Sequence, residues 1–198
     1  MFLIAYLATL AAVAAQPPVP ATQPADAAEH CTHRGAVSLC KSGWTAEVSV
    51  SGTKLDFAKG FPLDDRTTFS IGKNGENYNV KFTWISGPAP TDDYIFYAAD
   101  IGRSSRGYEV TRLNASSVTP CNGTRVAILI SVDFGRGVVD SFWRDPGDKR
   151  GDRILRVKLD PKFASKDPNS ITYDDFLSII GKDYLKDERK ICAAAGMD

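Results

Sequence analysis

Apolar and polar residues alternate along most of the chain, and this period of two predicts β-strands. In the stretch 77–84 the even-numbered residues are aromatic or aliphatic and the odd-numbered residues are polar, as expected of a strand with one buried face. The stretch 126–134 has the same pattern, with valine, isoleucine or phenylalanine at every even position. Further β-rich stretches predict strands at 44–50, 67–71, 94–99, 108–113, 138–143 and 154–159, with a return strand that begins at Leu55.

Turn signals separate these strands, and one helix follows them. Ser51-Gly52-Thr53-Lys54 and Asn74-Gly75 are typical of hairpin turns, and the Asn-Gly pair favours type I′ geometry. Helical spacing is confined to the C-terminal end, where Ser170 is the predicted N-cap. The apolar residues of this helix are Phe176, Leu177, Ile180 and Tyr184. About nine strands followed by one helix predict a mainly β protein, an antiparallel, jelly-roll-like β-sandwich with a C-terminal α-helix.

The N-terminal end of the chain predicts export. Residues 1–15 carry no charged side chain and are almost wholly apolar, but the run is shorter than the ~20 residues that span a bilayer. It has the length of a signal-peptide core and ends in small residues, so we expect cleavage after Ala15. Residues 16–29 are a Pro/Ala-rich linker, which favours an extended chain. The remainder, 30–198, is then a single secreted, extracellular β domain with no predicted membrane span.

The chain contains four cysteines, Cys31, Cys40, Cys121 and Cys192. In an exported protein an even number of cysteines predicts disulfides, and four can pair in three ways. Cys31–Cys40 with Cys121–Cys192 is favoured because short loops close readily. The crossing pair Cys31–Cys192 and Cys40–Cys121 stays open as an alternative, since it would tie the two ends of the domain together.

The balance of charge and the types of side chain present argue against several kinds of partner. The 24 basic and 24 acidic side chains balance, so there is no basic excess of the kind that nucleic-acid binding requires. A zinc site would need His30 and His33 with reduced cysteines, whereas exported thiols are normally oxidised. Asp145, Asp148 and Asp152 lie among basic residues, which oppose a calcium ion. No Gly-rich phosphate loop follows a strand, as a nucleotide cofactor would need. Together with the arguments against zinc and calcium, this leads us to expect neither a metal nor a cofactor.

Two sequence motifs concern the surface of the protein. Asn114-Ala-Ser116 and Asn122-Gly-Thr124 are N-glycosylation sequons, and both fall between predicted strands. Their proximity in an exported chain predicts a glycoprotein. Arg150-Gly151-Asp152 matches an adhesion tripeptide, but its neighbours alternate in charge as in an ordinary solvated loop.

The residues that carry chemistry predict a binding module rather than an enzyme. The two histidines lie beside the linker, away from the predicted strands, so we do not expect a Ser–His–Asp triad. The aromatic residues Tyr94, Phe96 and Tyr97 and the strand carboxylates Asp133 and Asp140 are the candidate binding residues. We expect them to recognise a carbohydrate or an extracellular protein at a surface. A glycoside hydrolase stays as an alternative, since that chemistry uses a facing carboxylate pair and Asp133 could face Asp140 or Asp100 on other strands.

One family resemblance gives a further alternative. Gly43-Trp44, the segment 91–94 (Thr-Asp-Asp-Tyr), the late helix and the terminal Cys192 together resemble lipocalins. The resemblance implies a β-barrel that carries a small hydrophobic ligand. It covers scattered residues, so no ligand-binding residue follows from it.

Overall fold

The computed structural model describes residues 30–86, 93–121, 124–143, 152–183 and 192–193. The predicted signal peptide and linker, Asn122 and the Arg150-Gly151 pair lie outside these residues. The strands are β1 (His30–Arg34), β2 (Val37–Ser42), β3 (Thr45–Val50), β4 (Thr53–Leu55), β5 (Thr67–Asn74), β6 (Asn77–Ser86), β7 (Asp93–Ser104), β8 (Gly107–Cys121), β9 (Thr124–Asp133), β10 (Val138–Trp143) and β11 (Asp152–Lys158). The helices are η1 (Asp56–Ala58), α1 (Pro161–Ala164), η2 (Pro168–Ser170) and α2 (Tyr173–Asp183).

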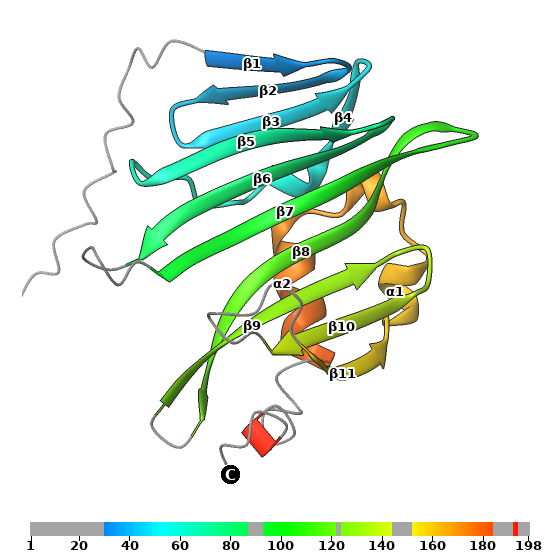
Figure 1. Cartoon of the computed structure of the whole chain (residues 1–198). Helices are drawn as coiled ribbons and strands as arrows, with labels where there is room; N and C mark the ends of the chain where they lie inside the picture. The colour runs from blue at the N-terminus through cyan, green and yellow to red at the C-terminus, as the bar shows by residue number, and fades with distance from the viewer. Residues whose placement is uncertain (1–29, 87–92, 122–123, 144–151, 184–191, 194–198) are drawn as a thin grey trace, which may run out of the picture.

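The strands form two antiparallel sheets, and this confirms the predicted mainly β fold with its C-terminal helix. Strands β1–β4 make a four-stranded sheet, and strands β5–β11 make a seven-stranded sheet in which every neighbour is the next strand along the chain. Figure 1 shows the small sheet beside β5 and helix α2 behind the large sheet. The large sheet is open, because β5 and β11 are its two edges, so the lipocalin-like barrel is wrong. Trp44, one of the residues behind that resemblance, is 45% exposed at the turn between β2 and β3.

Several predicted boundaries shift for local reasons. The strand expected to continue past Leu55 gives way to the 3-10 helix η1, which buries Phe57 and Ala58. The hairpin between β5 and β6 turns at Gly75 and Glu76, and only Gly75 has a positive φ (60°), a pattern of type II′ rather than type I′. The hairpin β1–β2 was not predicted, because β1 is exposed along its whole length and has no buried face to create an alternating pattern.

Helix α2 is capped by Thr172, so the prediction of Ser170 as its N-cap is wrong. Thr172 Oγ1 accepts a hydrogen bond from the Asp175 backbone N–H, and Asp175 Oδ2 accepts one from the Thr172 N–H, which is a reciprocal capping box. Burial raises the pKa of Asp175, but hydrogen bonds from Lys166 and Thr172 outweigh it and hold that pKa below its usual value. Ser170 belongs instead to η2.

The two disulfides join Cys31 to Cys40 and Cys121 to Cys192, which confirms the favoured pairing. The first links register partners on β1 and β2, and the second ties the end of β8 to the C-terminal region. Both are consistent with an oxidising, extracellular-type environment. No helix in the described part of the chain has the length and apolar character needed to cross a membrane.

One hydrophobic core is shared by both sheets and helix α2. The predicted inward residues of β6 and β9 whose side chains are described are buried within these strands, with Phe82 and Ile130 at 0% exposure. Between the large sheet and α2 lie six aromatic rings whose neighbouring centroids are 5.0 to 6.4 Å apart. They belong to Phe57, Phe61, Phe82, Tyr97, Tyr173 and Phe176. These rings pack against one another between the large sheet and α2.

Candidate binding groove

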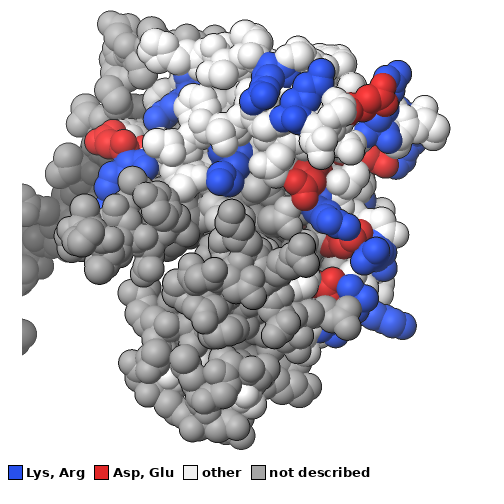
Figure 2. Space-filling view, viewed as in Figure 1, with Lys and Arg blue, Asp and Glu red and all other residues white. Residues whose placement is uncertain are grey.

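The face of the large sheet opposite α2, here called the outer face, carries polar side chains in rows that cross the strands. Strand pairing aligns one row from β6 to β9 and a second row beside it from β6 to β11. The first row contains Asn79, Asp100, Arg112 and Asp133. The second contains Lys81, Ala98, Asn114, Ser131, Asp140 and Arg156. Figure 2 shows this face, with acidic and basic side chains alternating down its right-hand side.

Asp100 is held in place by amides from both neighbouring strands. Asn79 Nδ2 donates to Asp100 Oδ1 over 2.7 Å, and Asn114 Nδ2 donates to Asp100 Oδ2 over 2.9 Å. The hydroxyl of Thr111, a bulge residue of β8, donates to the Asp100 backbone carbonyl over 3.1 Å. Each carboxylate oxygen keeps acceptor capacity, because it has a second lone pair. The carboxylate is therefore both fixed and able to accept another hydrogen bond.

Asp133 closes the turn between β9 and β10 and binds two arginines. Its Oδ1 accepts the Arg136 backbone N–H over 3.0 Å, and its Oδ2 accepts Arg112 Nε over 3.1 Å. Arg136 Nε lies 3.8 Å from the same Oδ2. This carboxylate therefore orients the turn and two guanidinium groups together.

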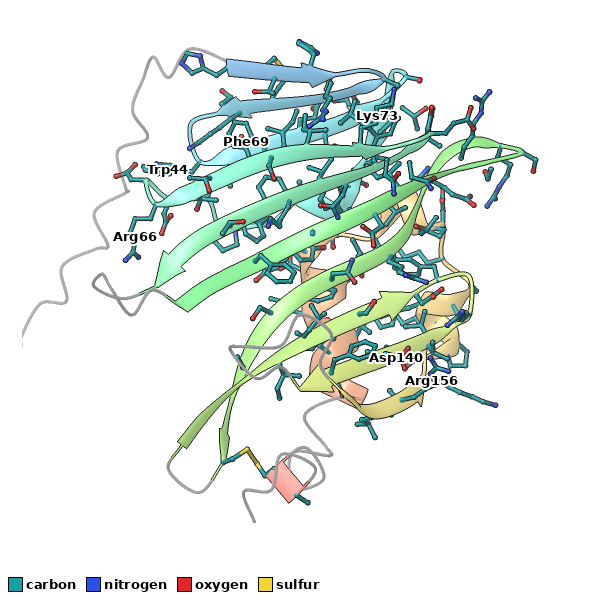
Figure 3. The ribbon with its side chains drawn as sticks, in the orientation of Figure 1. Trp44, Arg66, Phe69, Lys73, Asp140 and Arg156 are labelled. Atoms are coloured by element: carbon teal, nitrogen blue, oxygen red, sulfur yellow. A yellow bond between two sulfur atoms is a disulfide. The ribbon has the colours of Figure 1, made fainter. Side chains whose placement is uncertain are left out.

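Asp140 and Arg156 form a two-pronged ion pair across β10 and β11. Arg156 Nε and Nη2 donate to the two carboxylate oxygens over 2.6 and 2.7 Å, and Figure 3 shows the two side chains pointing toward each other. The hydrogen bond to Asp140 raises the pKa of the Arg156 guanidinium, and the nearby charge of Asp133 adds to this. The two carboxylates thus lie in one network of charge on the outer face.

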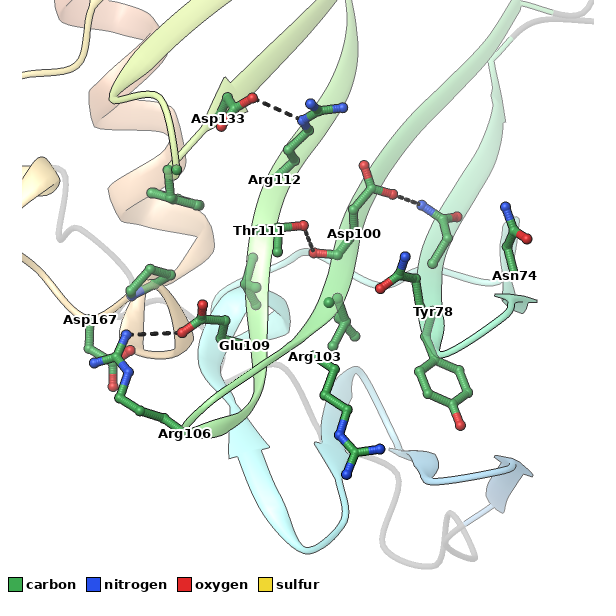
Figure 4. Close-up of a pocket in the computed structure, with 18 of the residues that line it drawn as sticks. Asn74, Tyr78, Asp100, Arg103, Arg106, Glu109, Thr111, Arg112, Asp133 and Asp167 are labelled. Atoms are coloured by element: carbon green, nitrogen blue, oxygen red, sulfur yellow. Dashed lines mark hydrogen bonds and ion pairs between the residues drawn. The ribbon is translucent and has the colours of Figure 1, made fainter.

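A groove of about 1240 Å³ runs over the first polar row and past the turn after β9 (Figure 4). Its walls come from β5–β8, from the turn that follows Asp133 and from residues 164–168. Gly102 forms part of the floor, because a Cβ at that position would lie 2.9 Å from Thr111 Cγ2. The hollow over this floor is lined by amide side chains, those of Asn74, Asn77 and Asn79.

The charged side chains at the β7–β8 hairpin are paired with each other. Arg103 Nη1 donates to Glu76 over 3.0 Å, and Arg106 Nη2 donates to Glu109 over 2.9 Å, as the latter contact in Figure 4 shows. With Lys73 beside the Tyr78 ring as a further cation, this end of the groove offers polar groups and a small net positive charge.

The candidate binding residues predicted from the sequence do not form one site. Tyr97 is 1% exposed and packs within the aromatic core, where burial raises the pKa of its hydroxyl well above the usual value. Phe96 faces the other way, and Lys81 Nζ lies 5.7 Å from its ring centre. The Tyr94 side chain lies outside the described residues. Asp133 lines the groove, whereas Asp140 lies beyond its lining on β10.

The groove residues Asn79 and Arg112, and Arg136 in the turn beside the groove, were missed as site residues. The alternation in 77–84 already placed Asn79 on the polar face of its strand. What it did not show is the cross-strand register that sets Asn79 beside Asp100. Arg112 reaches the outer face because β8 has a bulge at this point, and a bulge interrupts the regular alternation.

The geometry gives the glycoside hydrolase alternative no support. In that reaction one carboxyl protonates the leaving group while a second faces it across the bond. Asp133 and Asp140 are instead engaged by arginine donors, and Asp100 is engaged by the amides of Asn79 and Asn114. Among the described residues there is no cluster of three or more His, Cys, Asp or Glu side chains that could hold a metal ion.

Comparison with protein-family models, with curated proteins and with solved structures finds no match to this chain. The function therefore has to be inferred from the geometry of the groove.

Proposed function

We propose that this protein is a secreted, glycosylated binding module whose outer-face groove holds a carbohydrate. The observation that carries the proposal is the pre-set mixture of donors and acceptors around Asp100. A sugar hydroxyl both donates and accepts, so its site needs amides and carboxylates close together. Because Asn79 and Asn114 already fix the carboxylate, little side-chain freedom is lost when a ligand binds.

A carbohydrate fits the lining better than a protein partner does. The apolar residues of the lining include Tyr78, Ile101 and Val110, and all three are buried in the sheet. Protein interfaces usually centre on accessible aromatic or aliphatic anchors. The groove exposes amide, carboxylate and guanidinium groups, and its accessible apolar surface comes from the smaller contributions of Phe134, Ala164 and Pro168.

Export and glycosylation belong to the same proposal. The two disulfides support an oxidising destination. Of the two sequons, Asn114 is part of the groove network, and its Nδ2, the atom that a glycan would modify, donates to Asp100. The proposal therefore assigns Asn114 to ligand binding and keeps Asn122 as the glycosylation site.

The test is a glycan array probed with the purified chain, followed by titration calorimetry with the best glycan. We expect Asp100→Ala to weaken binding about tenfold or more, the equivalent of losing one charge-assisted hydrogen bond. The matched control is Glu47→Ala, which removes a carboxylate from an exposed ion pair with Lys54 on the small sheet and should bind as the wild type does. A chain that binds no glycan, or an Asp100→Ala variant that folds and binds normally, would overturn the proposal.

A further inference from the structure

The two ends of the groove differ in charge. At the hairpin end each arginine has an acidic partner and neutral amides line the hollow, where Lys73 Nζ lies 5.6 Å from the Tyr78 ring centre. At the Asp133 end basic side chains outnumber acidic ones. Among the described residues, Arg112 and Asp133 line this end, and just beyond the lining are the basic Arg136, Arg156 and Lys158 and the acidic Asp140.

The excess of positive charge is accessible. One carboxylate, Asp133, serves two guanidinium groups, and the Arg112 and Arg136 side chains are 47% and 65% exposed. Within the described residues the terminal Nη atoms of both arginines have no acceptor. Lys158 is also exposed. It lies in the same cross-strand row as Asp133, because Val138 of β10 pairs with both residues.

We propose that the carbohydrate bound in this groove is acidic, with a carboxylate or sulfate group seated against Arg112 and Arg136. This inference rests on the proposed function and adds the charge and the orientation of the ligand. A planar guanidinium fork matches a carboxylate or sulfate through paired N–H donors. Asp133 holds both forks in place through Nε, which leaves their terminal nitrogens for the ligand. The neutral part of the sugar chain then extends over Asp100 toward the amide-lined hollow.

The test compares ligands that differ only in charge. Calorimetry with the full chain uses an oligogalacturonate and its methyl ester as one pair, and a sulfated dextran with unmodified dextran as the other. The first pair tests a carboxylate and the second a sulfate. We expect the acidic member of at least one pair to bind about tenfold more tightly at low salt, and the difference to shrink as salt is added.

Substitutions locate the acidic group. Arg136→Gln keeps the backbone N–H that closes the turn, so the fold is retained, and it should remove most of the preference for the acidic ligand. Arg103→Gln is the matched control, because Arg103 lines the same groove at its hairpin end and is paired with Glu76. Unfolding midpoints of both variants check that the fold is intact.

Each outcome decides between the two proposals. Equal binding of acidic and neutral ligands would overturn the acidic-ligand inference and leave the carbohydrate proposal standing. An acidic preference that survives Arg136→Gln, or that Arg103→Gln removes, would also overturn it. Failure to bind any carbohydrate, including capture of a protein partner in its place, would overturn both.

Discussion

Neighbouring residues on β7 show how the two faces of the seven-stranded sheet differ. Ala99 is 0% exposed and packs into the core, whereas Asp100 faces outward and is held by Asn79 and Asn114. The inner face is stabilised by burial and by ring contacts, which depend on volume more than on direction. The outer face is held by directional hydrogen bonds that exist only in one strand register.

This difference assigns separate roles to the two faces. A substitution on the inner face changes the area removed from water and hence the free energy of unfolding. A substitution on the outer face changes the position and charge of hydrogen-bond donors and acceptors, whose arginine side chains are 39–65% exposed while Asp133 and Asp140 are buried. The two faces should therefore respond differently to truncation, to added salt and to loss of a hydroxyl group.

Truncation of the inner face should have the largest effect. Phe176 is 1% exposed on α2, and its ring centre lies 5.0 Å from that of Tyr97. We expect Phe176→Ala to lower the free energy of unfolding by about 3–5 kcal/mol, because it removes buried area and leaves a cavity. Urea denaturation measures the loss.

The adjacent residue provides the control for this substitution. Leu177 is 43% exposed on the same helix, so Leu177→Ala should change stability by about 0.5 kcal/mol or less. Equal losses of stability in the two variants would mean that α2 does not pack on the sheet through the face that carries Phe176.

Removal of a charge from the outer face should have a smaller effect that depends on salt. Asp140→Asn keeps the shape of the side chain but removes the charge that pairs with Arg156. Because the Arg156 side chain is 39% exposed, the pair is partly screened by ions. We expect Asp140→Asn to lower the free energy of unfolding by less than Phe176→Ala does. This loss should become smaller as sodium chloride is added.

Denaturation of the same variants at low and high salt makes the comparison. The loss caused by Phe176→Ala should be unaffected by ionic strength, since no charge is involved. If salt leaves the loss in Asp140→Asn unchanged, the outer face is held by shape and not by charge, and the contrast between the faces disappears.

The sequence predicted the inner face well because burial leaves a regular trace. Alternate apolar residues in 77–84 and 126–134 correctly identified β6 and β9 and their buried sides. The exposed strand β1 leaves no such trace, so it was missed. The C-terminal helix was found from its apolar spacing, but its cap was misplaced because Ser170 and Thr172 are both good capping residues.

The outer face could be predicted only in part, because it depends on which strands are neighbours. Asp133 and Asp140 were noticed as unusual strand carboxylates, and both lie on the polar face. Arg112 and Arg156 lie on the adjacent strands, 21 and 16 residues away, which is beyond the reach of a local pattern, whereas Arg136 lies only three residues after Asp133. Tyr97 was misjudged for a different reason. Its strand has apolar residues on both faces, so the sequence does not reveal which aromatic ring faces the core.

The smallest expected effect comes from two tyrosine hydroxyls on the inner face. The Tyr78 hydroxyl accepts the Ala36 backbone N–H over 3.1 Å and so links the two sheets. The Tyr97 hydroxyl is buried and has no hydrogen-bond partner within the described part of the chain. Both residues carry a phenol hydroxyl on the same sheet. They differ in whether that hydroxyl has a hydrogen-bond partner.

We expect Tyr78→Phe to lower the free energy of unfolding by about 1 kcal/mol, since it leaves a partly buried N–H without its acceptor. Tyr97→Phe should be neutral or stabilising by up to about 1 kcal/mol, because it removes a polar group that was buried without compensation. Urea denaturation of both variants under one set of conditions measures the difference. A loss of stability in Tyr97→Phe as large as that in Tyr78→Phe would show that the buried hydroxyl has a partner. The inner face would then depend on directional contacts as the outer face does.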